Sequence, residues 1–310
     1  GLSGTPIYNR GGEIYQVMNI LDFHCLGDWE SFTREWCAGY GSDVLARPEE
    51  LGEFLRREGM MLRRTKAEVL RELPPKRRVV QAVDADTALY EAGMQPVYEK
   101  MRALMALGGG NASQAALLTE QIVSGERQAT GLAKAPHVAA FVRALLEGGE
   151  RVLLFAHHHS VFDVYARELK HQHPVMVTGR ENTLQKDRAV QAFMQGDTSL
   201  CCISLRAASG LNLQKATCVV FGELDWSPAV HSQAEDRAHR MGQEDSLLCY
   251  YLVCNTGSDP DVQDALGLKI SQFSGLMGQQ PEAAEDRDLA LQEAERHMND
   301  ILARLAQQVS

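Results

Sequence analysis

Hydrophobic and polar positions divide the chain into two parts with different periods. From about residue 128, short continuous apolar runs alternate with segments whose apolar residues recur at steps of three or four. Continuous apolar runs are typical of strands buried on both faces, and their alternation with helices predicts a parallel sheet covered by helices. The expected strands are 152–156, 175–178, 200–204, 218–221 and 247–253, and the expected helices are 136–147, 160–171, 183–195 and 229–241.

The first hundred residues have mostly helical patterns and few strand patterns, with apolar residues such as Leu51, Phe54, Leu55 and Leu62 near helical spacing. A glycine-rich stretch at 108–113 predicts a flexible break. Near the C-terminus, apolar residues at steps of three and four predict an amphipathic helix, which packs either on its own domain or on a partner. The expected organisation is a helical region at 1–107, a linker at 108–127, an α/β domain at 128–278 and a C-terminal helix at 279–310.

Composition narrows the class of protein. The chain has 310 residues, 45% of them hydrophobic and 23% charged, which is typical of a globular protein with two cores. It has no apolar run of membrane length and no secretory pattern, so no membrane partner is expected. Seven cysteines without a CxxC pair indicate buried thiols in a reducing cytoplasm. A net charge of -10 argues against a protein that coats itself with nucleic acid.

Candidate chemistry gathers in the stretch QAEDRAHRMGQ at residues 233–243. Upstream, Ser227 and Pro228 predict an N-cap and a first-turn proline. Gln233, Arg237 and Arg240 then fall at i, i+4 and i+7. The pattern predicts that these three side chains share one edge of a short helix.

Two arginines on one edge suit a phosphate site, because a guanidinium binds two phosphate oxygens at once and keeps its charge. Gly242 is expected to end the helix. The alternative is an exposed helix face on which the arginines pair with Glu235 and Asp236. The stretch alone does not decide between a phosphate site and a surface pair.

Five sets of residues resemble, in order, the motifs of the Swi/Snf-type ATPases in helicase superfamily two. They are GLSGTPI at 1–7 for motif III, LRRTK at 62–66 with LPPK at 73–76 for the interlobe brace, FAHH at 155–158 for motif IV, SLRAASGLNL at 204–213 for motif V, and FGELDWSP at 221–228 with 233–243 for motif VI. FAHH and the Phe-x-Glu-Leu-x-Trp pattern are most similar to the annealing-helicase (HARP-type) branch. The resemblance runs from residue 1 to about 278.

The resemblance implies a fold, a cofactor and a set of nucleotide-site residues. The fold is a RecA-like second motor lobe preceded by a mostly helical region, residues 1–107, which would be the tail of the first motor lobe and the interlobe brace. The cofactor is ATP with Mg. The implied arginine fingers are Arg237 and Arg240. The implied nucleotide-site residues are Gln233, Ser209, Gly210 and Asn212, although Gln233 alone is also consistent with a loop cap. Ser3 and Thr5 would couple the nucleotide state to DNA binding.

The resemblance also implies contacts with duplex or forked DNA. The implied contact residues are Arg206, Trp226, His157 and His158. Two of these residues have an alternative role without DNA contact, because Arg206 is also consistent with a surface charge and Trp226 with half-buried packing. The run of three histidines at 157–159 predicts no metal site, because neighbouring side chains on an extended segment point to opposite faces and no Cys or Asp stands at ligand spacing.

A phosphate-binding Gly-x-x-x-x-Gly-Lys-Ser/Thr loop and a Mg-binding acidic motif do not occur in the 310 residues. The chain also begins with Gly1 inside a motif, so we expect a fragment that does not hydrolyse ATP alone. ATP and Mg would be held mainly by the first motor lobe of the same protein. The expected function is the second lobe of a monomeric, ATP-dependent DNA translocase, in DNA repair or fork remodelling. The alternatives are a non-catalytic DNA- or protein-binding module and an RNA-directed remodeller.

Overall fold

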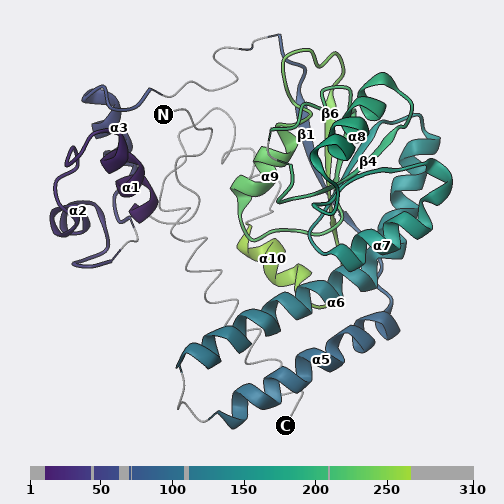
Figure 1. The fold of residues 1–310 in the computed structure, drawn as a ribbon, viewed down its shortest axis with the longest axis horizontal. Coiled ribbons are helices and arrows are strands. Elements are labelled where there is room, and N and C mark those ends of the chain that lie inside the picture. Colours follow the sequence, from purple (N-terminus) through teal and green to yellow (C-terminus); the bar gives the residue numbers. More distant parts are fainter. Residues whose placement is uncertain are drawn as a thin grey trace. The chain divides into compact units, whose positions relative to one another are not determined.

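A computed structural model describes residues 11–42, 45–62, 70, 72–107, 112–208 and 210–266. The described residues up to 70 belong to one compact unit and those from 72 onward to another (Figure 1). Within these ranges no helix is long and apolar enough to span a bilayer. The predicted C-terminal helix at 279–310 lies outside the described residues.

The described part of the first unit contains three helices. They are α1 (Gly11–Leu21), α2 (Trp29–Trp36) and α3 (Pro48–Arg57). The side chain of Asp28 accepts a hydrogen bond from Ser31 N at 2.8 Å and caps the start of α2. The core of this unit is formed by buried apolar residues, among them Ile14, Phe32, Trp36, Leu51 and Leu55. These helices confirm the helical pattern of this part of the chain.

A six-stranded sheet forms the centre of the second unit. Its strands are β1 (Lys76–Ala82), β2 (Val152–Ala156), β3 (Val175–Val177), β4 (Leu200–Ser204), β5 (Cys218–Phe221) and β6 (Leu247–Val253). The order in the sheet is β1-β6-β5-β2-β4-β3, and all neighbouring strands are parallel. The five predicted strands are confirmed, four of them with the predicted bounds.

Strand β1 was not expected, because residues 1–107 showed few strand patterns. Its sequence, KRRVVQA, begins with three cations and has no continuous apolar run. The strand lies at the edge of the sheet beside β6, where most of its residues are only half-buried. An edge strand needs less apolar surface than a central one, so its sequence lacks the usual strand signal.

Two long helices precede β2 and pack side by side: α5 (Thr87–Ala106) and α6 (Ala112–Glu147) (Figure 1). Small residues allow close packing, since a Cβ on Gly93 would lie 2.8 Å from the Ala129 Cβ. Residues 112–127, which were predicted to belong to a linker at 108–127, form the first part of helix α6. The local pattern missed this part because its stability comes from packing against α5 rather than from a wide apolar face.

Helices cover both faces of the sheet. Helix α6 and α7 (His159–Glu168) pack on the face that carries Val152 and Leu154. On the opposite face, His231 of α9 (Pro228–Glu235) contacts the rings of Phe221 and Tyr251. The remaining elements are η1 (Lys170–Gln172), α8 (Thr183–Gln195) and α10 (Asp259–Ala265).

Helix α8 has the predicted bounds, and local residues explain both ends. The side chain of Asn182 accepts from Gln185 N, and the side chain of Gln185 accepts from Asn182 N, which forms a capping box. At the other end Gly196 has φ 93°, a left-handed conformation that favours glycine.

Candidate nucleotide and nucleic-acid sites

The carboxyl ends of β2 and β5 lie on either side of a topological switch point. The connection after β2 leads to β3 on one side, and the connection after β5 leads to β6 on the other. In open parallel sheets, ligands bind in the crevice at such a point. His157 and His158 follow β2, Arg206 follows β4 and Trp226 lies in the loop after β5. The structure thus places the four predicted DNA contacts after three adjacent strands.

Glu223, which follows β5, organises this edge of the sheet. Its Oε2 accepts from His157 N at 2.8 Å and His158 N at 2.9 Å, and its Oε1 lies 2.6 Å from His158 Nδ1. Burial would raise the pKa of the Glu223 carboxyl, but the hydrogen bonds and charge of His158 bring it below its usual value. Glu223 was missed as a site residue; its only sequence signal was its place in the Phe-x-Glu-Leu-x-Trp pattern.

Helix α6 leaves room for this carboxylate because residue 131 is glycine. A Cβ on Gly131 would lie 2.5 Å from Glu223 Oε1, too close for any other residue without a shift. One turn earlier, Arg127 Nη2 donates to Leu224 O at 2.8 Å and lies 3.7 Å from Asp225 Oδ2. Arg127 was also missed by sequence analysis, since its contact lies 97 residues away.

His157 and Arg206 differ in what they offer a phosphate. Burial first, and then the nearby charges of Arg127 and His158, lower the pKa of His157 to about 4. The imidazole is therefore neutral at physiological pH, and its Nδ1 is buried with no hydrogen-bond partner among the described residues. Arg206 is exposed and permanently charged. Of the two side chains, only that of Arg206 carries a charge that could attract a phosphate, while His157 could donate or accept a hydrogen bond.

Trp226 is half-buried and packs against the apolar cluster between α5 and α6, which includes Met94, Val97 and Ile122. This position agrees with the packing alternative for part of the ring. Part of the side chain remains exposed at the same edge of the sheet as Arg206. A role in DNA binding stays a prediction.

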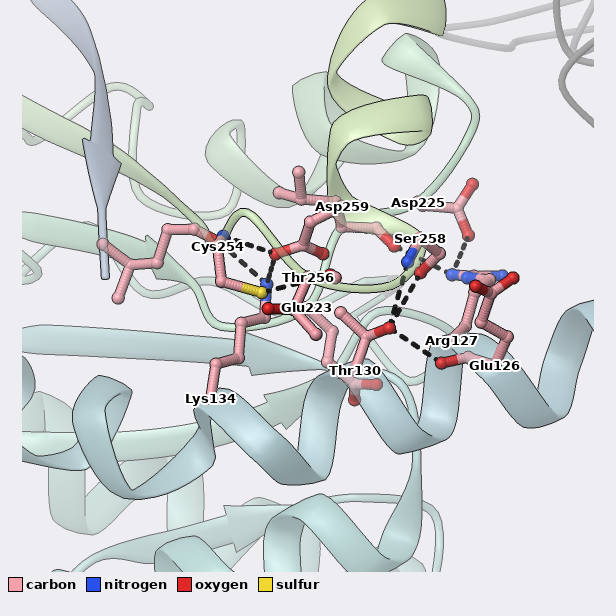
Figure 2. A network of polar contacts seen from close by, with 12 residues as sticks. Glu126, Arg127, Thr130, Lys134, Glu223, Asp225, Cys254, Thr256, Ser258 and Asp259 are labelled. Atoms are coloured by element: carbon pink, nitrogen blue, oxygen red, sulfur yellow. Dashed lines mark hydrogen bonds and ion pairs between the residues drawn. The ribbon is translucent and has the colours of Figure 1, made fainter. Parts of the chain in front are cut away.

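A buried ion pair anchors α6 to the start of α10 (Figure 2). Lys134 Nζ donates to Asp259 Oδ2 at 2.6 Å and to Leu252 O at 2.8 Å, and its side chain is fully buried. The same Asp259 oxygen accepts from Cys254 N at 2.9 Å. Burial of a charge is tolerated here because each charged group has partners. The pair holds α6, and with it Arg127 and Gly131, against the carboxyl edge of the sheet.

Residues 236–243, which include Arg237 and Arg240, are called the arginine segment below. Their conformation differs from the sequence prediction, because α9 ends at Glu235 rather than near 241. The chain continues in tight turns, in which Arg237 N donates to Ala234 O and Arg240 N donates to Ala238 O. Arg237 and Arg240 therefore do not lie on one helix edge with Gln233. The helix stops where the carboxylate of Glu235 becomes fully buried, a contact that local sequence does not reveal. Gly242 has a left-handed φ of 91° but lies beyond the end of the helix.

The start of α9 is also held differently from the prediction. Ser227 and Pro228 occupy the N-cap and first-turn positions, but the Ser227 side chain makes no capping hydrogen bond. Instead, His231 Nδ1 donates to Ser227 O at 3.1 Å, while Asp225 N donates to His231 Nε2 at 3.2 Å. Burial lowers the pKa of His231, so the ring stays neutral and can make both contacts.

Motifs V and VI nevertheless lie together. Arg240 Nη1 donates to Leu211 O at 3.0 Å, and Leu213 N donates to Arg237 O at 2.9 Å. Arg237 Nε donates to Gln233 O at 3.2 Å. Both arginines are half-buried.

The small residues of motif V lie on the same loop. Gly210 has φ 79°, and a Cβ there would contact nothing within 4 Å. Asn212 is exposed. A role of Gly210 and Asn212 in nucleotide binding stays a prediction. Ser209, Ser3 and Thr5 lie outside the described residues.

Metal ligands were not predicted, and the described residues contain no group of three His, Cys, Asp or Glu side chains that could hold a metal ion.

Two protein families match the chain. Residues 1–129 match the SNF2-related domain, and residues 136–242 match the helicase conserved C-terminal domain. The chain belongs to the SNF2-related, helicase-like family. A SWI/SNF-related matrix-associated actin-dependent regulator of chromatin subfamily A-like protein 1 from Drosophila melanogaster is 30% identical over 283 residues, which cover 88% of this chain and 36% of the relative.

Annealing helicases are among the relatives of this SNF2-related chain. The human DNA annealing helicase and endonuclease ZRANB3 is 29% identical over 270 residues, which cover 82% of this chain and 24% of the relative. The chain spans about a third or less of the length of these two relatives. The predicted family is confirmed.

Solved structures confirm the RecA-like fold. The C-terminal part of the Fun30 ATPase domain is 15% identical, with a TM-score of 0.52 over 76% of this chain and 99% of that chain. The Sulfolobus solfataricus SWI2/SNF2 ATPase core in complex with dsDNA is also 15% identical, with a TM-score of 0.50 over 97% of this chain and 65% of that chain. At this identity the likeness concerns the fold alone.

Proposed function

We propose that residues 72–266 belong to the second motor lobe of an ATP-dependent translocase on duplex or forked DNA. The observation that carries the proposal is the contact between the motif V loop and the segment that holds Arg237 and Arg240. Such a pairing would suit a phosphate site, because the two half-buried arginines provide permanent charge. ATP with Mg, bound mainly by a first lobe outside this sequence, would supply the phosphoryl group.

The two arginines would stabilise the negative charge that develops as this group is transferred. Backbone carbonyls hold each guanidinium in place, that of Leu211 for Arg240 and that of Gln233 for Arg237. Donors held in advance cost little reorganisation during the reaction. Arginine fingers in related phosphoryl-transfer enzymes raise the rate by about 10³ to 10⁵.

The carboxyl edge of the sheet would contact the DNA backbone through Arg206, His157, His158 and Trp226. Because Arg206 is exposed and charged, it is expected to give most of the electrostatic attraction. The annealing helicases among the relatives favour DNA over RNA as the substrate and suggest DNA repair or fork remodelling as the setting.

Arg206→Ala should weaken binding to all DNA sequences alike and reduce the slope of log K against log salt by about 1. Fluorescence anisotropy with labelled duplex at several salt concentrations measures both quantities. Arg188→Ala, on the exposed surface of α8, is a matched control that should leave the slope unchanged. Equal slopes for the wild-type protein and Arg206→Ala would exclude Arg206 from the DNA contact.

ATP hydrolysis measured with and without nucleic acid tests the reaction itself. A protein that contains both lobes should hydrolyse ATP faster with duplex or forked DNA, while the 310-residue chain alone should show no turnover above the buffer blank. Stimulation by RNA but not by DNA would favour an RNA-directed remodeller. DNA binding without hydrolysis by the two-lobe protein would favour a non-catalytic binding module.

A further inference from the structure

The carboxylate at the end of α9 is buried among two cations and a phenol. Glu235 Oε2 accepts from Lys76 Nζ at 2.7 Å and from Arg78 Nη2 at 2.6 Å. Its Oε1 accepts from Arg78 Nε at 2.7 Å and from Tyr251 OH at 2.8 Å. The side chain of Glu235 has no exposed surface, while those of Lys76 and Arg78 are 16% and 15% exposed. These four residues are called the Glu235 clamp below.

Both cations of the clamp come from the edge strand β1. In a strand, alternate side chains point to the same face, so Lys76 and Arg78 face Glu235 while Arg77 faces away and is exposed. Val80 pairs with Tyr251, which places the phenol on the same face as the two cations. The sequence separation between the cations and Glu235 is 157 to 159 residues.

The residues just before β1 contact the arginine segment and the start of β6 at further points. His239 Nε2 donates to Pro74 O at 2.8 Å, and Leu247 N donates to Pro75 O at 3.1 Å. Lys76 Nζ also lies 3.9 Å from Asp236 Oδ1. Residues 74–78 therefore hold the segment 235–247 at its start, in its middle and at its end.

The charges of the clamp make it rigid. Burial would raise the pKa of the Glu235 carboxyl, but Lys76 and Arg78 beside it hold the pKa at about 2. The carboxylate therefore stays charged at neutral pH. Removal of one member of such a buried group leaves an uncompensated charge, so the group resists rearrangement. The fully bonded oxygens of Glu235 also fix the direction in which the chain leaves α9.

We propose that Lys76 and Arg78 are positioning residues for Arg237 and Arg240. Holding Glu235 fixes the point from which the arginine segment leaves α9, two residues before Arg237 and five before Arg240. The inference rests on the proposed function, because it concerns the same arginines. In this inference, strand β1 as well as the motif V loop sets the positions of Arg237 and Arg240.

Hydrogen exchange tests the structural part in the 310-residue chain. Arg78→Met removes the bidentate partner of Glu235 and keeps an unbranched side chain. It should speed exchange of the amides at 236–243 by about tenfold or more, with little change in α7. Arg77→Met, the neighbouring exposed arginine, is the matched control and should change neither region. Lys76→Met leaves the ion pair between Arg78 and Glu235 in place and should speed amide exchange at 236–243 by a smaller factor. This variant replaces Arg78→Met in the test if Arg78→Met does not fold.

Kinetics of a two-lobe protein test the functional part. Arg78→Met should lower the DNA-stimulated kcat by about tenfold or more, with KM for ATP and DNA affinity changed less than about threefold. Arg78→Lys keeps the charge and should recover part of the kcat. A purely structural role would lower the folded fraction and leave the kcat per folded molecule unchanged.

Unchanged exchange at 236–243 in Arg78→Met, or faster exchange to the same extent throughout the unit, would overturn the inference. A wild-type two-lobe protein that shows no DNA-stimulated hydrolysis would overturn the proposed function instead. In that case local exchange in Arg78→Met would still show that the clamp holds the segment. The two failures are therefore distinguishable.

Discussion

Protonation of Glu235 should lower the free energy of unfolding of the second unit. The carboxyl titrates at about 2 in the folded chain, compared with 4.5 for an ordinary glutamate. At about 1.4 kcal/mol for each tenfold change in proton affinity, this contributes roughly 3 kcal/mol to the free energy of unfolding at pH 7. Because the folded-state pKa is the lower one, the contribution is complete above pH 4.5 and is lost as the pH falls toward 2.

Glu235→Gln isolates this contribution, because glutamine does not titrate and leaves Lys76 and Arg78 without their anion. The variant should be less stable than the wild type by about 3 to 5 kcal/mol at pH 7. By pH 3 the wild-type chain should have lost about 2 kcal/mol of its carboxylate contribution, so the difference between the two proteins should shrink by that amount.

Urea unfolding at pH 7, 5, 4 and 3, followed by circular dichroism, measures the difference in free energy at each pH. Glu91→Gln, at an exposed position on α5, is the control and should differ little from the wild type at any of these pH values. A difference between Glu235→Gln and the wild type that stays constant from pH 7 to pH 3 would refute the reasoning.

Two further substitutions test the packing around α6. Gly131→Ala places a Cβ 2.5 Å from Glu223 Oε1 and should lower the free energy of unfolding by about 1 to 3 kcal/mol. The control Gly52→Ala in α3 meets only the flexible end of a side chain and should be neutral or stabilising. Equal urea midpoints for Gly131→Ala and the wild type would contradict this expectation. Lys134→Met leaves Asp259 buried without its cation and should lower the free energy of unfolding by about 3 to 5 kcal/mol. Addition of Asp259→Asn should recover part of this loss. Additive losses in this double-mutant cycle would show that the two residues are not coupled.

The central strands of the sheet could be predicted from sequence because they are buried on both faces and therefore consist of continuous apolar runs. Helix α8 could be predicted with its bounds because Asn182 and Gly196 mark its ends locally. Strand β1 could not, because it is a half-buried edge strand without a continuous apolar run. The end of α9 could not, because Glu235 is buried by Lys76 and Arg78 more than 150 residues away, a contact with no local signal.

Prediction of the candidate sites from sequence is limited in the same way, by contacts between residues that lie far apart in the chain. The predicted residues after β2, β4 and β5 lie at one edge of the sheet because adjacent parallel strands end there, and their role in DNA binding stays a prediction. Glu223 and Arg127 organise that edge through contacts that only the fold creates. For the arginine segment, the helical spacing predicted the wrong backbone conformation, since Arg237 and Arg240 lie in turns beyond α9.

DNA-stimulated ATP hydrolysis by a two-lobe protein carrying Arg240→Ala tests the central claim most directly. If Arg240 stabilises the charge of phosphoryl transfer, the stimulated kcat should fall by about 10³ or more, while duplex DNA affinity stays within a few-fold of the wild type. Near-normal turnover combined with a large loss of DNA affinity would contradict the account and would place Arg240 in the DNA contact instead.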